Sequence, residues 1–345
     1  MVIERIRWVD SIRGIAILIV VLFHFSVHRP INYPNFVWGK HGVDLFFIIS
    51  GFVMLHSLKN IKSSKQFLIN RFSKLYPIYI FSIILISTIF YIIFLKSGVL
   101  FYNFTLKKFL FNLTMFQQMF NIQCFDNAHW TLKIDLFFYL MLFFIYYFGF
   151  MKYLVHIFLF LNIFLLFLFK YNLDFSLSLD FYFTIYQFLP LFLIGIILYN
   201  IYDDGKCYSY YYVLLVVVFL IQNYFSFKTG WNTPVQIFEY SIYPLILFAF
   251  IFMFLVGIHY SKYIENFNIL SKIGDMSYVW YLIHLSIFVE ILVPFLQISF
   301  HLNFGIASFL ISLPTSFIVS YFIHRFIEIP LSLKLKSILN EKINF

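Results

Sequence analysis

Residues 276–298 read MSYVWYLIHLSIFVEILVPFLQI, and residues 303–326 read NFGIASFLISLPTSFIVSYFIHRF. Each stretch is long enough to cross the roughly 30 Å hydrocarbon core of a bilayer as a helix. Neither stretch alternates polar and apolar residues with the period of two that the strands of a membrane barrel require. These two runs therefore predict transmembrane helices, and similar runs recur along the chain.

The same pattern predicts eight further helices, at 9–28, 43–58, 75–95, 130–150, 152–169, 181–200, 209–226 and 235–258. The composition agrees, because 62% of the 345 residues are hydrophobic and 11% are charged, whereas soluble domains are about half apolar and a quarter charged. No linker rich in Pro, Gly or Ser interrupts the pattern. We expect an all-α fold, a polytopic transmembrane bundle of about ten helices that forms a single domain over 1–345.

The basic residues indicate how the chain is oriented in the membrane. A net charge of +9 would suggest a nucleic-acid partner for a soluble protein, but here it reflects the excess of Lys and Arg in cytoplasmic loops. With the N-terminus inside, 15 of the 24 basic residues lie in inner segments, 7 lie in outer segments, and Arg13 and Lys133 lie within helices. This bias predicts that both termini are cytoplasmic, and we expect no nucleic acid among the partners.

Ionisable side chains inside a bilayer are costly and therefore mark candidate functional sites. An outer group shares one predicted depth and consists of His24, Asp44, Asp135 and Glu239. An inner group, about 20 Å below by the helical rise, consists of Asp10, Arg13, Arg71, Lys74, Arg325 and Glu328, while His284 is predicted near the middle of its helix. The inner group is suited to an anionic, phosphate-bearing molecule. The outer histidine and carboxylates are suited to proton transfer.

Several of these residues also have a purely structural interpretation. Asp10 and Arg13 could be an ion pair at spacing i,i+3, Asp44 could cap a helix, and His284 could be a satisfied core histidine. The basic run over 59–74 is mainly a topology signal. Two other functions stay open: a multi-pass transporter or flippase for a glycan or acyl carrier without covalent chemistry, and a structural scaffold. The halves of the chain show no repeat, which counts against a transporter.

Six ordered segments carry a resemblance to a known family. They are WVDSIRGIAILIVVLFH (8–24), GVDLFFIISGF (42–52), NRFSKLYP (70–77), HWTLKIDLFFY (129–139), SYVWYLIH (277–284) and FIEIP (326–330). Together they resemble the signatures of the acyltransferase 3 family, membrane enzymes that O-acylate bacterial surface glycans and other acceptors. The resemblance covers about residues 5–332, and it implies about ten helices and an acyl-CoA donor.

The resemblance also implies roles for individual residues. The essential arginine and the catalytic histidine of the family fall on Arg13 and His24. Arg71 and Lys74 join Arg13 as the expected acyl-CoA contacts, although Lys74 stands where the family usually has Arg. Asp135 stands where the family usually has Glu, and it is expected with Asp44 to support His24. Expected supporting residues are Asp10, Ser50, Trp130, Tyr278, His284 and Glu328.

The sequence thus predicts a multi-pass O-acetyltransferase of the bacterial inner membrane. Acetyl-CoA or another acyl-CoA is expected as co-substrate, with no bound cofactor and no metal. The expected partners are membrane lipid and a glycan acceptor, with polysaccharide-biosynthesis proteins as further candidates. Because the chain ends about fifteen residues after Pro330, we expect no fused extracytoplasmic esterase-like domain. The acceptor glycan, the acyl group and the oligomeric state remain open.

Overall fold

A computed structural model describes residues 5–27, 36–97, 105–170, 179–204, 209–229, 234–264 and 268–341. Within these ranges all regular secondary structure is helical, which confirms the predicted all-α class. Eight of the described segments are long and apolar enough to cross a membrane: Arg7–Val27, Val37–Lys59, Ser64–Lys96, Asn127–Tyr147, Phe150–Leu168, Ile242–Ser261, Ser277–Phe300 and Ile306–Glu341. Two further apolar helices, Gln187–Asp203 and Ser209–Phe225, are shorter. The count of ten and the cytoplasmic termini stay predictions.

The chain forms two compact units that interleave along the sequence. The first unit comprises Met1–Ala16, His41–Ser64 and Ile134–Gly274, and the second comprises Ile17–Lys40, Lys65–Lys133 and Asp275–Phe345. Helix α1 (Arg7–Val27) contributes its first half to the first unit and its second half to the second unit.

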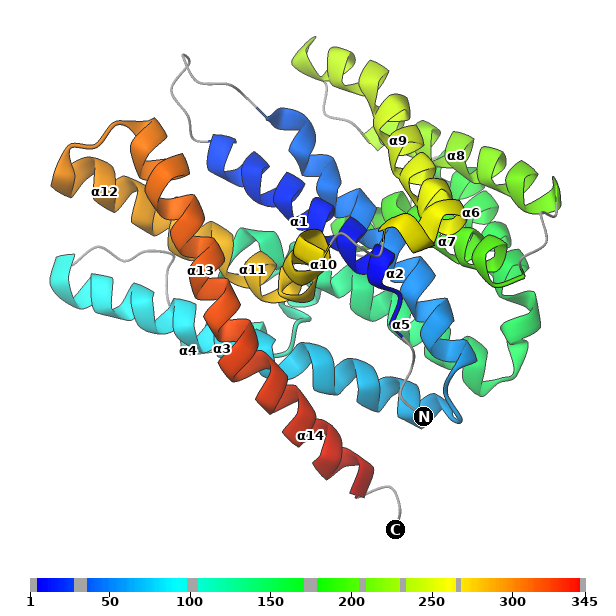
Figure 1. Cartoon of the computed structure of the whole chain (residues 1–345), viewed down its shortest axis with the longest axis horizontal. Helices are drawn as coiled ribbons and strands as arrows, with labels where there is room; N and C mark the ends of the chain where they lie inside the picture. The colour runs from blue at the N-terminus through cyan, green and yellow to red at the C-terminus, as the bar shows by residue number, and fades with distance from the viewer. Residues whose placement is uncertain are drawn as a thin grey trace. The chain divides into compact units, whose positions relative to one another are not determined.

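The first unit is built around helix α2 (Gly42–Lys59). Its other helices are α5 (Leu132–Tyr147, all but its first two residues), the 3-10 turn η4 (Phe150–Tyr153), α6 (Leu154–Lys170), α7 (Leu179–Asp204), α8 (Ser209–Thr229), α9 (Pro234–Ile264) and α10 (Asn268–Asp275, all but its last residue). Helices α8 and α9 lie side by side (Figure 1).

Helices α2 and α7 approach each other backbone to backbone. A Cβ atom on Gly51 would overlap the carbonyl oxygen of Phe192, and a Cβ atom on Gly195 would overlap the carbonyl oxygen of Ile48. Small residues permit such close contact in lipid, where helix association depends on van der Waals packing rather than on the hydrophobic effect. The 42–52 segment is thereby held tightly against α7.

The second unit contains three π-helical segments. Its helices, besides the second half of α1, are α3 (Ser64–Ser97, from its second residue), α4 (Leu106–Asn112), α11 (Ser277–Ile283), α12 (Val293–Phe300), α13 (Leu313–Ile323) and α14 (Ile329–Glu341). The π-helices are η5 (His284–Leu292), η6 (Ile306–Ser312) and η7 (His324–Glu328). The 3-10 turns are η1 (Val37–His41, without its last residue), η2 (Gln117–Phe120) and η3 (Asn127–Thr131). Through η7, α13 continues into α14 as one long rod (Figure 1). Because π-helical turns are rare and often occur at functional sites, the start of η5 at His284 is of interest.

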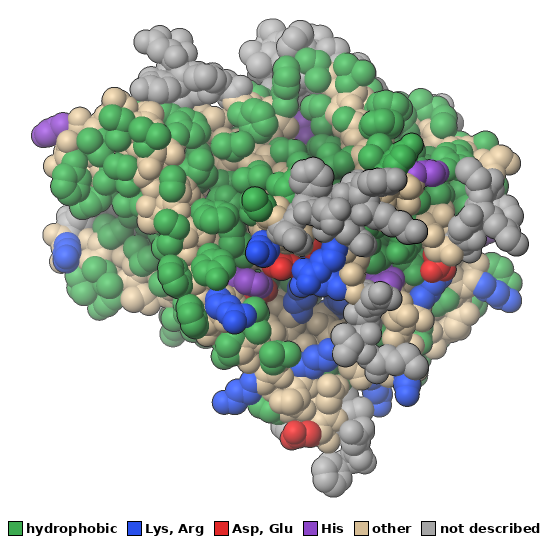
Figure 2. All heavy atoms as spheres, in the orientation of Figure 1, with side chains coloured by type: hydrophobic (Ala, Val, Ile, Leu, Met, Phe, Trp, Pro, Cys, Tyr) green, Lys and Arg blue, Asp and Glu red, His purple; other side chains and the backbone are tan. Residues whose placement is uncertain are grey.

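Large apolar side chains are exposed on the second unit, as expected for a surface that lipid covers. Hydrophobic side chains lie over the visible face of α12 and α13 (Figure 2). In this unit Ile298 of α12 is 74% exposed and Leu310 of η6 is 70% exposed. Such exposure would promote aggregation in water, and it agrees with a multi-pass membrane protein.

Candidate active site

Two histidines meet in the second unit. His24 lies in the last turn of α1, where its Nδ1 atom is 3.0 Å from the carbonyl oxygen of Val20. The same Nδ1 atom is 3.0 Å from Nε2 of His284. His284 is fully buried, and its Nδ1 atom lies 2.9 Å from the carbonyl oxygen of Tyr281 and 3.1 Å from that of Trp280. A second imidazole is therefore one of the hydrogen-bond partners of the predicted catalytic histidine.

These contacts determine where the protons lie when both rings are neutral. A carbonyl oxygen only accepts hydrogen bonds, so Nδ1 of His284 must carry a hydrogen, and its Nε2 atom then accepts. Nδ1 of His24 faces two acceptors, Val20 and His284, and must also carry a hydrogen. The lone pair of His24 is consequently on Nε2. This tautomer can accept a proton at Nε2, while its Nδ1–H group stays hydrogen-bonded to Val20 and His284.

The sequence placed His284 near the middle of its helix and His24 in the outer half of the membrane. Their direct contact corrects this assignment, because the two rings must share one depth. Counting residues from a predicted helix end gives depth only for a helix that runs along the bilayer normal, and transmembrane helices are commonly tilted. The interpretation of His284 as a hydrogen-bonded core residue is correct, but that hydrogen bonding includes the predicted base.

A loop braces the start of η5 in the same unit. The carboxylate of Asp126 accepts hydrogen bonds from the backbone N–H groups of Ala128, at 2.7 Å, and Ser286, at 3.0 Å. The Nε2 atom of His129 lies 3.0 Å from the carbonyl oxygen of Leu282. Asp126 and His129 are both fully buried. Sequence reasoning missed these two residues, although an acid just before the HWTL segment was a signal that could have been used.

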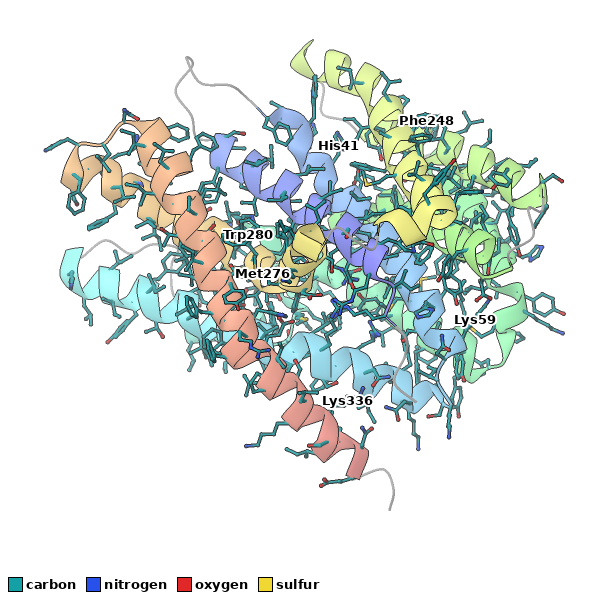
Figure 3. All side chains as sticks on the ribbon, in the orientation of Figure 1. His41, Lys59, Phe248, Met276, Trp280 and Lys336 are labelled. Atoms are coloured by element: carbon teal, nitrogen blue, oxygen red, sulfur yellow. The ribbon has the colours of Figure 1, made fainter. Side chains whose placement is uncertain are left out.

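The first unit holds the two predicted carboxylates. The hydroxyl of Ser50 donates to Asp135 at 3.0 Å, so the structure brings together predicted residues of two different motifs. Asp44 is 3.0 Å from Nδ1 of His41. His41 is not among the predicted site residues, although its i,i+3 spacing from Asp44 at a helix start could have indicated the pair. Figure 3 shows His41 at one end of α2 and Lys59 at the other.

Arg13, the predicted acyl-CoA contact of the first unit, belongs to a group of three charged residues that form two ion pairs. Arg13 contacts Asp10 at 2.9 Å, and Arg5 contacts the other oxygen of the same carboxylate at 2.6 Å. The i,i+3 pairing predicted for Asp10 and Arg13 is therefore present. Two guanidinium groups against one carboxylate leave one net positive charge, so the group retains its attraction for an anion.

The other predicted basic residues lie on α3 in the second unit. Arg71 is half-buried with its guanidinium 5.9 Å from the ring centre of Phe67, and Lys74 is exposed. They are one turn apart and share a face of the helix. The hydroxyl of Tyr278 donates to the carbonyl oxygen of Leu75 at 3.3 Å, which joins α11 to this basic segment.

The remaining predicted supporting residues also belong to the second unit. Glu328 is buried and pairs with His324 one turn earlier. Trp130 is half-buried in η3. Glu239, the remaining outer carboxylate, has a side chain outside the described residues. Among the side chains that the structure describes, no three His, Cys, Asp or Glu residues gather in a possible metal site.

The predicted site residues thus divide between the units. His24 lies in the second unit, whereas Asp44 and Asp135 lie in the first. The pairing of His24 with one of these carboxylates, expected from the sequence, stays a prediction.

The chain was compared with known proteins. The family model for the acyltransferase domain of the acyltransferase 3 family matches residues 6–325. A protein of Rhizobium radiobacter, named protein 2 in picA locus, is 34% identical over 95 residues, which cover 25% of this chain and 47% of that protein. The chain therefore spans about half the length of this curated relative. No solved structure matches. Because the family match covers nearly the whole chain, this multi-pass membrane protein belongs to the acyltransferase 3 family.

Proposed function

We propose that the protein is an O-acetyltransferase of the bacterial inner membrane. It transfers an acetyl group from cytoplasmic acetyl-CoA to a hydroxyl of a cell-surface glycan or of its lipid-linked precursor. The observation that carries the proposal is the hydrogen-bonded pair of His24 and His284 in a chain of this family.

In this proposal His24 is the general base. The acceptor hydroxyl gives its proton to Nε2 of His24 while its oxygen attacks the thioester carbonyl. The new C–O bond forms, the C–S bond breaks, and the thiolate of CoA takes the proton back from the imidazolium. During the step, Nδ1–H of His24 donates to His284, which stabilises the charged ring. Asp135, held by Ser50, is retained from the sequence as the carboxylate that balances this charge.

The donor is assigned to the predicted basic residues. Arg71 and Lys74 present two positive charges on one face of α3, and Arg13 provides the net charge of its group with Asp10. Phosphate groups bind such side chains through charge-assisted hydrogen bonds. Along α1, eleven residues separate Arg13 from His24, which corresponds to about 16 Å. The pantetheine arm of the donor is long and narrow enough to cover such a distance.

Acetyl transfer by purified protein tests the proposal. Protein in detergent is given radiolabelled acetyl-CoA and crude surface glycan, and both free CoA and labelled glycan are measured. The wild type should release CoA and label the glycan, and His24→Ala should abolish labelling. A flippase or transporter would label nothing.

The chain offers a matched control for this substitution. The Nδ1 atom of His259 also contacts the carbonyl oxygen four residues earlier on its own helix, at 2.8 Å. His259→Ala therefore removes a similar local contact from a histidine with no proposed role, and it should retain transfer. If His24→Ala still labels the glycan, His24 is not the base.

A further inference from the structure

A second polar cluster lies in the first unit, where it is formed by His41 and Asp44 at the start of α2, Gln222 of α8 and Tyr243 of α9. Nδ1 of His41 is 3.0 Å from Asp44, and the side-chain amide of Gln222 donates to the Tyr243 hydroxyl at 3.0 Å. The rings of His41 and Tyr243 are in contact, with centroids 4.7 Å apart. The four side chains form one connected network.

The direction of these hydrogen bonds follows from the chemistry of the groups. An ionised Asp44 only accepts, so Nδ1 of His41 carries a hydrogen and Nε2 holds the lone pair. The Tyr243 hydroxyl accepts from the side-chain amide of Gln222. This arrangement uses one end of the Gln222 side chain. The other end, the side-chain oxygen, is buried and has no hydrogen-bond partner among the residues that the structure describes.

A buried amide oxygen without a partner indicates that the network is incomplete. Gln222 is only 1% exposed, so bulk water does not satisfy it. At the opposite end of the network the side chain of His41 is 14% exposed, and its Nδ1 atom is held by Asp44. A ligand O–H group could donate to the lone pair of His41, and a second could donate to Gln222 once the ligand has displaced the side chains that bury the amide oxygen. The acetyl-transfer step proposed above uses neither residue.

We propose that His41, Asp44, Gln222 and Tyr243 form a binding site for the hydroxyl groups of a saccharide. A carboxylate, an amide, an imidazole and an aromatic ring offer the mixed polar and flat surface that a sugar ring requires. The inference deepens the proposed function, on which it rests for the identity of this saccharide as the acceptor. In this arrangement Asp44 hydrogen-bonds His41 and helps to bind the acceptor, while His24 and His284 carry out the proton transfer.

Chemical modification of His41 measures binding without requiring turnover. Diethyl pyrocarbonate acylates an accessible, neutral imidazole nitrogen, and mass spectrometry of the peptide that contains His41 gives the rate. Purified wild-type protein is treated alone, with crude surface glycan, and with acetyl-CoA. Glycan should slow the modification of His41 about fivefold or more, as a site largely occupied by ligand requires, and acetyl-CoA should leave the rate unchanged. An equal rate with and without glycan overturns the proposal.

Substitutions separate ligand binding from a purely structural network. Tyr243→Phe and Gln222→Leu should each abolish the protection of His41, and they should raise the KM for glycan about tenfold, as loss of one hydrogen bond predicts, with little change in kcat. Asn223→Leu is the matched control, because its amide donates to the Phe219 carbonyl of its own helix at 2.7 Å. If the network only joins helices and binds no saccharide, glycan will not protect His41 from diethyl pyrocarbonate even in the wild type.

The two proposals can fail separately. If the wild type binds glycan at His41 but transfers no acetyl group, the result supports the saccharide site and refutes the proposed transferase activity. If acetyl transfer proceeds and depends on His24 but glycan never protects His41, the result refutes the saccharide site and supports the transferase proposal.

Discussion

Replacement of His284 separates the role of this residue as partner of His24 from its role in packing. In His284→Leu, Nδ1–H of His24 keeps the Val20 carbonyl but loses the acceptor 3.0 Å away. A hydrogen bond to a charged group contributes about 1.5–3 kcal/mol. The charge exists only after His24 has taken its proton, so the loss falls on the transition state. At about 1.4 kcal/mol per factor of ten, kcat should decrease about tenfold to a hundredfold.

A second variant provides the control. In His284→Gln the side-chain carbonyl can replace Nε2 as acceptor for His24, so kcat should recover to within a few-fold of the wild type. Both variants lose the ring nitrogen that donates to Trp280 and Tyr281. Both should therefore be destabilised to a similar degree, by about 1–3 kcal/mol for the buried carbonyl groups left unpaired.

The assay is acetyl transfer with saturating acetyl-CoA and glycan, and thermal unfolding is measured on the same preparations. The KM for acetyl-CoA should stay near the wild-type value in both variants, because His284 does not belong to the proposed donor contacts. Wild-type kcat in folded His284→Leu would refute the reasoning. Equal loss of kcat in both variants would assign His284 a packing role.

Three further predictions concern residues of the second unit, and one of them uses a control residue of the first unit. Asp126→Ala removes the acceptor of two backbone N–H groups, and it should lower the free energy of unfolding in detergent by about 3 kcal/mol or more. Asp203→Ala is the control, because it removes an ion pair whose side chains are 39% exposed. This change should lower the free energy of unfolding by at most about 1 kcal/mol. Burial raises the pKa of the Cys124 thiol, so the reactive thiolate is scarce at neutral pH. In a Cys207→Ser background, maleimide labelling of folded protein should therefore be slow at pH 7 and should accelerate only above the pH at which an exposed thiol ionises; fast labelling at pH 7 contradicts this. Arg71→Glu should weaken acetyl-CoA binding, measured by equilibrium dialysis, tenfold or more, and should change the KM for glycan less; unchanged acetyl-CoA affinity removes Arg71 from the donor site.

The sequence was most informative where physical constraints are strong and local. Long apolar runs predict membrane helices directly, because the bilayer fixes their length, and the all-helical class is confirmed. The Asp10–Arg13 pair also followed from the spacing of three residues within one helix. These features require no knowledge of which helices are neighbours.

Contacts between distant segments could not be predicted in the same way. His24 and His284 are 260 residues apart, and no periodicity in either segment indicates the other. The motifs suggested a carboxylate as a partner of His24, which stays a prediction, and they did not suggest the contact with the imidazole of His284. Similarly, Ser50, which donates a hydrogen bond to Asp135, lies 85 residues earlier. Such pairs depend on helix tilt and rotation, which are set by packing.

The pi-helical start of η5 depends on buried polar groups rather than on local propensity. The sequence 277–298 shows a regular apolar helix, yet the helix widens at His284. Carbonyl groups on the preceding turn bond to side chains of His284 and His129. Because these side chains come from different parts of the chain, the widening could not be read from the segment alone.

The glycine contact between α2 and α7 has a consequence for biosynthesis. Gly51 emerges from the ribosome 144 residues before Gly195, a delay of roughly 7 to 30 s at about 5–20 residues per second. During that interval α2 enters the bilayer without the helix against which its backbone fits. A nascent chain arrested before Gly195 should therefore leave α2 open to degradation or to capture by a membrane chaperone, and release of the arrest should end that vulnerability.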